Sequence, residues 1–135
     1  MKNLILTMIL IPAMAVAAYA THNNELEKEP FSEERFEKLQ AKGAVILVDV
    51  FADWCGTCAK QQELIKQYRN ENPDKEFYIL EVDFDRDKKY VRKLRAPRQS
   101  TLLVFQGENQ FWYSVAETRY EVIAREMDKA FAAKS

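Results

Sequence analysis

Eight consecutive residues, Ala44 to Phe51 (AVILVDVF), form an apolar run that only Asp49 interrupts. The run is rich in β-branched residues, and Gly43 precedes it. Continuous apolarity over this length, without alternation, is typical of a strand that is buried on both faces. The run therefore predicts a central strand, and the polar segment from Cys58 to Asn70 that follows it predicts a helix.

The rest of the chain continues this strand–helix pattern. Further helices are expected at 32–42, 85–94 and 118–133, and further strands at 77–84, 101–105 and 110–115. Strand–helix–strand units imply parallel pairing with right-handed crossovers, and the final hairpin adds antiparallel strands. The sequence thus predicts an α/β fold in the order αβαβαββα, with a central mixed sheet flanked by helices.

The first twenty residues have the features of a secretory signal peptide. A basic tip at Lys2 precedes an apolar run that ends at Ala18-Tyr19-Ala20. An uncleaved membrane anchor is the alternative, but spanning takes roughly 20 apolar residues, and Pro12 interrupts this shorter run. We expect cleavage after Ala20, export to a bacterial periplasm, a flexible lead-in at 21–30 and one domain at 31–135.

The charge balance excludes one class of function. Removal of Lys2 with the leader leaves 19 Lys and Arg residues against 21 Asp and Glu residues. A nucleic-acid-binding domain would carry a basic face instead. We therefore expect no nucleic-acid partner, and nothing in the pattern demands a dimer, so a monomer is expected.

Cys55 and Cys58 are the only cysteines of the chain. A disulfide between them closes a four-residue ring, which restrains the unfolded chain little, so this cysteine pair is expected to be chemical and not structural. A zinc site would need further ligands, and the only histidine is His22. Haem attachment needs histidine after the second cysteine, where Ala59 stands. A copper site would use methionine, but Met127 is the only one beyond the leader.

The position of the pair favours thiol–disulfide exchange. The attacking species is a thiolate, and the start of a helix stabilises an anion through unpaired N–H groups and the helix dipole. Cys55 at that position would attack a substrate disulfide. Cys58, one turn further along, would resolve the mixed disulfide.

Residues 45–51 (VILVDVF), 52–58 (ADWCGTC) and 100–105 (STLLVF) resemble the thioredoxin family, and the likeness extends from about Phe31 to Ala133. The resemblance implies a thioredoxin fold and an oxidoreductase without a small-molecule cofactor. Its partners would be disulfide-containing protein substrates and a dithiol electron-exchange protein, such as a membrane-bound reductase.

The resemblance also assigns roles to single residues. Asp49 would be a buried acid that exchanges a proton with Cys58 through water, although from the residues alone a solvated carboxylate at the strand's rim is the alternative. Substrate would bind at five positions: Trp54, Gly56, Thr57, Ser100 and Thr101. The Gly-Thr dipeptide between the cysteines carries no imidazole, which favours a reductant over a strong oxidant.

Two residues depart from the family pattern. Ser100 stands where the family has a cis-proline that faces the cysteine pair, and we expect a trans bond there because a cis bond without proline costs about 2.5–4 kcal/mol. Glu81 stands where a lysine is frequent, and an inward carboxylate there would raise the pKa of Asp49. Loss of the cis-proline favours one alternative, a binding module or chaperone with a passive disulfide. A second alternative is a thiol-based metal chaperone, against which the lack of a supporting histidine or methionine counts.

Overall fold

The structure is a computed structural model that describes residues 26–134. The predicted signal peptide and the first half of the predicted lead-in lie outside the described residues.

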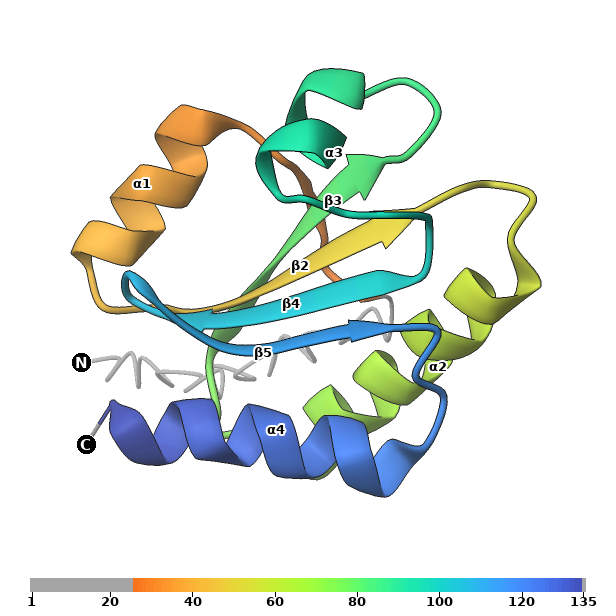
Figure 1. Ribbon diagram of the computed structural model, residues 1–135. Helices are drawn as coiled ribbons and strands as arrows, with labels where there is room; N and C mark the ends of the chain where they lie inside the picture. Colours follow the sequence, from red (N-terminus) through yellow and green to blue (C-terminus); the bar gives the residue numbers. More distant parts are fainter. Residues whose placement is uncertain (1–25, 135) are drawn as a thin grey trace, which may run out of the picture.

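One five-stranded sheet, in the order β1-β3-β2-β4-β5, forms the centre of the molecule (Figure 1). Parallel pairing joins β1, β3 and β2, whereas β4 is antiparallel to β2 and β5 is antiparallel to β4. The strands are β1 (Glu29–Pro30), β2 (Val45–Phe51), β3 (Phe77–Asp83), β4 (Thr101–Gln106) and β5 (Asn109–Val115). The mixed sheet and the central place of β2 confirm the fold class expected from the sequence.

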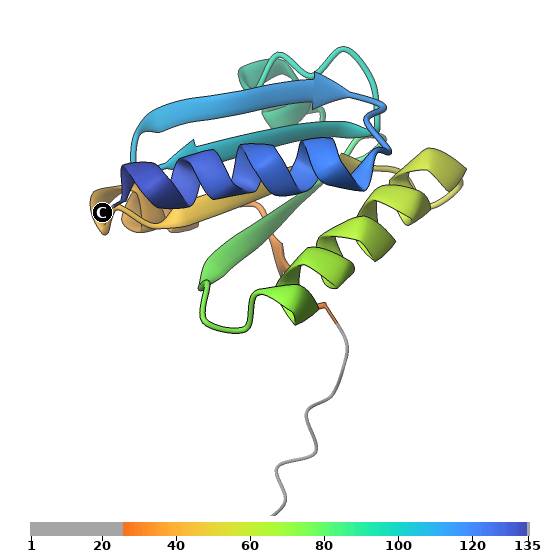
Figure 2. The ribbon, with the colours of Figure 1, turned by 90° about the horizontal axis from the view of Figure 1, so that it is seen from below.

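Two pairs of helices cover the two faces of this sheet, as Figures 1 and 2 show together. The helices α1 (Glu33–Ala41) and α3 (Lys88–Lys93) lie on one face, and α2 (Gly56–Glu71) and α4 (Tyr120–Ala133) lie on the other. Each pair encloses its own apolar cluster against the sheet. Within residues 26–134 no helix is long and apolar enough to cross a membrane.

The two clusters divide the side chains of β2 between the faces. Ile46, Val48 and Val50 belong to the cluster under α1 and α3, and Val45 and Leu47 belong to the one under α2 and α4. Because successive side chains of a strand point to opposite faces, the side chain after Leu47 on the α2 side is that of Asp49. The one acidic residue of the central strand is therefore directed toward the helix that carries the cysteines.

The expectation of a flexible lead-in up to Pro30 is wrong at its end, where Glu29 and Pro30 form β1. These residues pair with Leu80 and Glu81 of β3, and the N–H of Phe31 donates to the carbonyl of Glu81 at 2.8 Å. Backbone pairing with an open sheet edge requires no apolar pattern in the added strand. The polar sequence at this position therefore gave no pattern from which the strand could be predicted.

Helix boundaries also differ from the prediction. The helix α2 begins at Gly56, two residues before the expected Cys58, because Cys55 acts as its N-cap. The helix α3 begins at Lys88 and not at Asp85, because the carboxylates of Asp83 and Asp87 accept backbone N–H groups and hold the segment between them as a turn.

Candidate active site

The cysteine pair lies at the N-terminus of α2, directly after the carboxyl end of β2. Cys55 and Cys58 form a disulfide, with their Cα atoms 5.3 Å apart. Cys55 has extended backbone angles (φ −93°, ψ 105°), and its sulfur accepts the backbone N–H of Cys58 at 3.1 Å. Its exposed fraction is 7%, against 2% for Cys58. The sulfur of Cys55 thus occupies the anion-stabilising position at the helix start, and Cys58 is the more buried of the two.

Asp49 is fully buried and is not solvated at the rim of the strand. Its Oδ2 accepts a hydrogen bond from the side-chain amide of Gln62 at 3.1 Å, and within residues 26–134 its Oδ1 has no partner. The pKa of this carboxyl group is raised from 3.8 to about 7, chiefly by burial; the hydrogen bond from Gln62 lowers the pKa, the nearby Glu81 raises it and Lys28 lowers it. A carboxyl group with this pKa can both give and take a proton near neutral pH.

A chain of polar side chains leads from Asp49 to the surface. The Nε2 of Gln62 also donates to Glu81 at 3.3 Å, and the Nζ of Lys28 lies 2.7 Å from the same Glu81 oxygen. Asp49 and Glu81 are register partners on adjacent strands, so their side chains share a face of the sheet. Glu81 therefore points inward, as the sequence suggested it could.

Sequence reasoning missed Lys28 and Gln62. Lys28 lies just before β1, in a segment that was expected to be flexible, so no pattern could place it beside Glu81. Gln62 follows Cys58 by four residues, which places both on one side of α2. That spacing was a usable signal.

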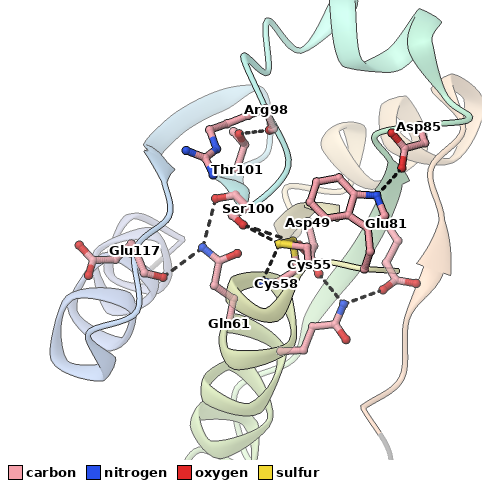
Figure 3. Close-up of a disulfide and its surroundings, with 12 residues drawn as sticks. Asp49, Cys55, Cys58, Gln61, Glu81, Asp85, Arg98, Ser100, Thr101 and Glu117 are labelled. Carbon is pink, nitrogen blue, oxygen red and sulfur yellow. Dashed lines mark hydrogen bonds between the residues drawn. A yellow bond between two sulfur atoms is a disulfide. The ribbon is translucent and has the colours of Figure 1, made fainter. Parts of the chain in front are cut away.

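Ser100 has a trans peptide bond, as expected, and residues 26–134 contain no cis bond. Its backbone instead adopts a left-handed conformation with φ +64°. The hydroxyl oxygen lies 3.1 Å from the sulfur of Cys55 and 3.2 Å from that of Cys58 (Figure 3). The structure thus brings Ser100 to the cysteine pair through its side chain.

Thr101, expected at the substrate-binding surface, has its side chain turned away from it. This residue is fully buried, and its hydroxyl donates to the carbonyl of Arg98 at 2.6 Å. Its side chain closes the loop before β4 and does not reach the surface beside the cysteine pair.

Gln61 is a further site residue that the sequence did not reveal. It is fully buried on the inner side of α2, and its amide nitrogen donates to the carbonyl of Ser100 at 3.2 Å and to that of Glu117 at 3.0 Å. A single side chain thus joins the cysteine-bearing helix to the loops before β4 and before α4. A polar residue three positions after Cys58 on an otherwise apolar helix face was the available signal.

The outer side of the site is exposed. The side chain of Trp54 is 67% exposed, and its indole N–H donates to Asp85 at 2.8 Å. Gly56 is exposed and Thr57 is partly buried, so both lie at the surface between the cysteines. These three residues form an accessible border beside the more buried disulfide.

Within residues 26–134, no three His, Cys, Asp or Glu side chains lie together as a metal ion would require. His22, the only histidine of the sequence, lies outside that range. The arrangement of a disulfide at a helix start, with a buried acid on the adjoining strand, is the arrangement of a thioredoxin-type redox site.

Comparison with known proteins agrees with this class. The family model described as Thioredoxin matches residues 26–129, and the chain belongs to the thioredoxin family. Thioredoxin-1 of Saccharomyces cerevisiae is 31% identical over 72 residues, which cover 53% of this chain and 68% of that protein. Membership supports thiol–disulfide oxidoreductase chemistry in general.

Solved structures show the same fold. The crystal structure of Trxlp from Edwardsiella tarda EIB202 superposes with a TM-score of 0.69 at 30% identity, covering 75% of this chain and 98% of that one. Thioredoxin from Trypanosoma brucei brucei superposes with a TM-score of 0.65 at 14% identity, covering 83% and 96%. The second likeness is one of fold alone.

Proposed function

We propose that this protein is an exported thiol–disulfide oxidoreductase that reduces disulfide bonds in protein substrates. The observation that carries the proposal is the placement of the cysteine pair, with the sulfur of Cys55 at the N-cap of α2 and the buried acid Asp49 directed toward the same helix. Membership of the family supports thiol–disulfide exchange as the class of reaction. The positions of Cys55 and Asp49 support their roles as nucleophile and as proton acceptor.

The reaction moves two electrons from the dithiol of this protein to the substrate disulfide. The Cys55 thiolate attacks one substrate sulfur, so a mixed disulfide forms and the other substrate sulfur leaves as a thiolate that takes up a proton. Cys58 then gives its proton to Asp49 through water and attacks the Cys55 sulfur. The mixed disulfide breaks, and the second substrate sulfur also leaves as a thiolate that takes up a proton. The substrate dithiol is released, and the Cys55–Cys58 disulfide remains.

The activity test is the reduction of a protein disulfide, such as those of insulin, by catalytic amounts of protein with dithiothreitol as electron source. Cys55→Ser should abolish the catalysed rate, whereas Cys58→Ser should still attack and accumulate a mixed disulfide that mass spectrometry detects. A matched control is Ser114→Ala, which removes a hydroxyl on β5 and should leave the rate unchanged. A wild-type rate equal to that of dithiothreitol alone would overturn the proposal.

The reducing direction rests on the Gly56-Thr57 dipeptide, which adds no imidazole to the site. The test is the reduction potential, measured by equilibration in glutathione buffers with thiol trapping. A value near the −270 mV of thioredoxin supports a reductant that receives electrons from a dithiol partner, such as a membrane-bound reductase, whereas a value near −120 mV makes the protein an oxidant.

Export rests on residues 1–20 alone, and these lie outside the described part of the chain. Expression of the full chain in a bacterium, followed by cell fractionation and mass spectrometry, tests it. A periplasmic product that begins at Thr21 supports cleavage after Ala20, and a cytoplasmic product that still carries the leader contradicts it.

A second candidate function is a binding module with a passive disulfide. The low exposure of Cys55 favours it, because a nucleophile with only 7% of its surface exposed must be uncovered before it can attack. This alternative predicts that Cys55→Ser leaves partner binding unchanged. It also predicts that the wild-type protein gives no catalysed disulfide reduction.

A further inference from the structure

The hydroxyl of Ser100 contacts both sulfurs of the cysteine pair. Its oxygen lies 3.1 Å from Cys55 and 3.2 Å from Cys58, and the residue is fully buried (Figure 3). Within residues 26–134, no other side chain forms a hydrogen bond with either sulfur. Ser100 is therefore the one side-chain hydroxyl placed to respond when the disulfide opens.

Backbone hydrogen bonds hold Ser100 in this orientation. Its N–H donates to the carbonyl of Val50 at 2.8 Å, and its carbonyl accepts from the N–H of Ala116 at 2.8 Å and from Gln61 at 3.2 Å. Proline could not adopt this geometry, because its ring fixes φ near −65° and removes the N–H, whereas Ser100 has φ +64°. The backbone of the surrounding elements thus fixes the direction in which the Ser100 hydroxyl points.

The hydroxyl interacts differently with the two redox states. A disulfide sulfur is a weak acceptor, whereas a thiolate accepts a charge-assisted hydrogen bond that is roughly twice as strong as a neutral one. Cys55 also accepts the N–H of Cys58, so a thiolate on Cys55 would have two donors. A group that binds the reduced state more tightly shifts the redox equilibrium toward that state.

We propose that Ser100 is a positioning residue whose hydroxyl donates to the Cys55 thiolate of the reduced protein and thereby stabilises the dithiol form. The inference rests on the redox role proposed above for the cysteine pair. Ser100 would partly offset the reducing character of the Gly-Thr dipeptide, and the potential would lie above that of the same pair without the hydroxyl.

Titratable groups also lie on the strands and loops near the pair. They are Asp49 on β2, Glu81 on β3, Asp53 in the loop before Cys55, Arg98 before β4 and Glu117 before α4. None of them hydrogen-bonds to a sulfur within the described range. These groups are the same in wild type and in the Ser100 variants. A comparison at fixed pH and salt therefore measures the effect of the Ser100 hydroxyl alone.

The experiment compares Ser100→Ala and Ser100→Gly with wild type in two measurements. Thiolate absorbance near 240 nm gives the pH midpoint of Cys55 ionisation in the reduced protein, and equilibration with glutathione gives the redox constant. Both variants should raise the midpoint by about one pH unit and shift the redox constant about tenfold toward the disulfide, which corresponds to about 30 mV.

The two variants distinguish the effect of losing the hydroxyl from the effect of a changed backbone conformation. Glycine adopts a positive φ without strain, whereas alanine does not, so an effect of backbone conformation would differ between them. The matched control Ser114→Ala removes a hydroxyl that touches neither sulfur and should leave both measurements at wild-type values.

Unchanged midpoints in both folded variants, or shifts of opposite sign, would overturn the inference. Neither measurement needs turnover. A protein that shows the shift but reduces no substrate would support the role of Ser100 and contradict the proposed function.

Discussion

The carboxyl group of Asp49 changes its charge close to neutral pH, because burial raises its pKa to about 7. In the unfolded chain the group ionises near pH 4, so between about pH 4 and pH 7 the folded protein binds a proton that the unfolded chain has lost. The free energy of unfolding therefore falls as the pH rises through this window. The fall is at most about 4 kcal/mol, at 1.36 kcal/mol per pKa unit.

The substitution Asp49→Asn removes this dependence, because the amide cannot ionise. We expect the variant to match wild type or be slightly less stable at about pH 4.5, and to be more stable by about 2–4 kcal/mol at about pH 8. Urea unfolding at the two pH values measures the difference. The control Asp74→Asn, which changes an exposed carboxylate in the turn after α2, should follow the wild-type curve. Parallel curves for Asp49→Asn and wild type would contradict the burial argument.

Among single residues, the sequence could predict the roles of those that a pattern of neighbouring residues marks. Asp49 stands out because it interrupts the apolar run at 44–51, and Cys55 and Cys58 stand out because they are the only cysteines and lie shortly after that run. The contact between Ser100 and the sulfurs could not be predicted, because it depends on a left-handed backbone and on a loop that packs 45 residues away along the chain.

The start of α2 is an element-scale feature that the sequence placed within two residues. Gly56 is its first residue, and a Cβ atom there would meet no atom within 4 Å. Alanine restricts the unfolded chain more than glycine does, so Gly56→Ala should raise the free energy of unfolding by about 0.5–1 kcal/mol. Urea unfolding of the oxidised protein measures it.

The matched comparison is Gly107→Ala. Gly107 has φ +55°, and a Cβ atom would lie 3.4 Å from the carbonyl of Gln40, so this variant should lose stability. If both variants lose stability, the helix does not begin at Gly56 with the geometry described.

The strand β1 connects the N-terminal part of the described chain to the buried acid. Lys28, which precedes it, pairs with Glu81, and Lys28 lowers the pKa of Asp49 while Glu81 raises it. Lys28→Met should therefore move the pKa of Asp49 upward, and Glu81→Gln should move it downward. Carboxyl chemical shifts of Asp49 followed by NMR across the pH range measure both. Shifts of the same sign would show that the two side chains act through the fold and not through charge.

This element also shows a limit of sequence reasoning. Strands β2 to β5 were expected because side-chain pattern marks them, whereas β1 is two residues long and polar, and backbone hydrogen bonds to β3 define it. Its effect on Asp49 depends on the register that sets Pro30 opposite Glu81 and Glu81 opposite Asp49. No local pattern encodes such a register.

At the scale of the whole molecule, the cysteine pair links redox state to folding stability. The disulfide spans three positions in the sequence, so ring closure itself contributes little to the difference between the two forms. By a thermodynamic cycle, the difference in free energy of unfolding between the oxidised and the reduced protein corresponds to the difference in reduction potential between the cysteine pair in the folded chain and the same pair in the unfolded chain. Each 30 mV corresponds to about 1.4 kcal/mol.

In a reductant the folded chain lowers the reduction potential of the pair, which means that folding favours the disulfide. The oxidised form of such a protein is therefore more stable against unfolding than its reduced form. We expect the free energy of unfolding in urea to be higher without reductant than with excess dithiothreitol, and the Cys55→Ser/Cys58→Ser double variant to be insensitive to it. In the strong oxidant DsbA the reduced form is the stabilised one. A more stable reduced form here would thus contradict the proposed direction of electron flow. It would leave the exchange chemistry of the cysteine pair intact, because both directions use the same two sulfurs.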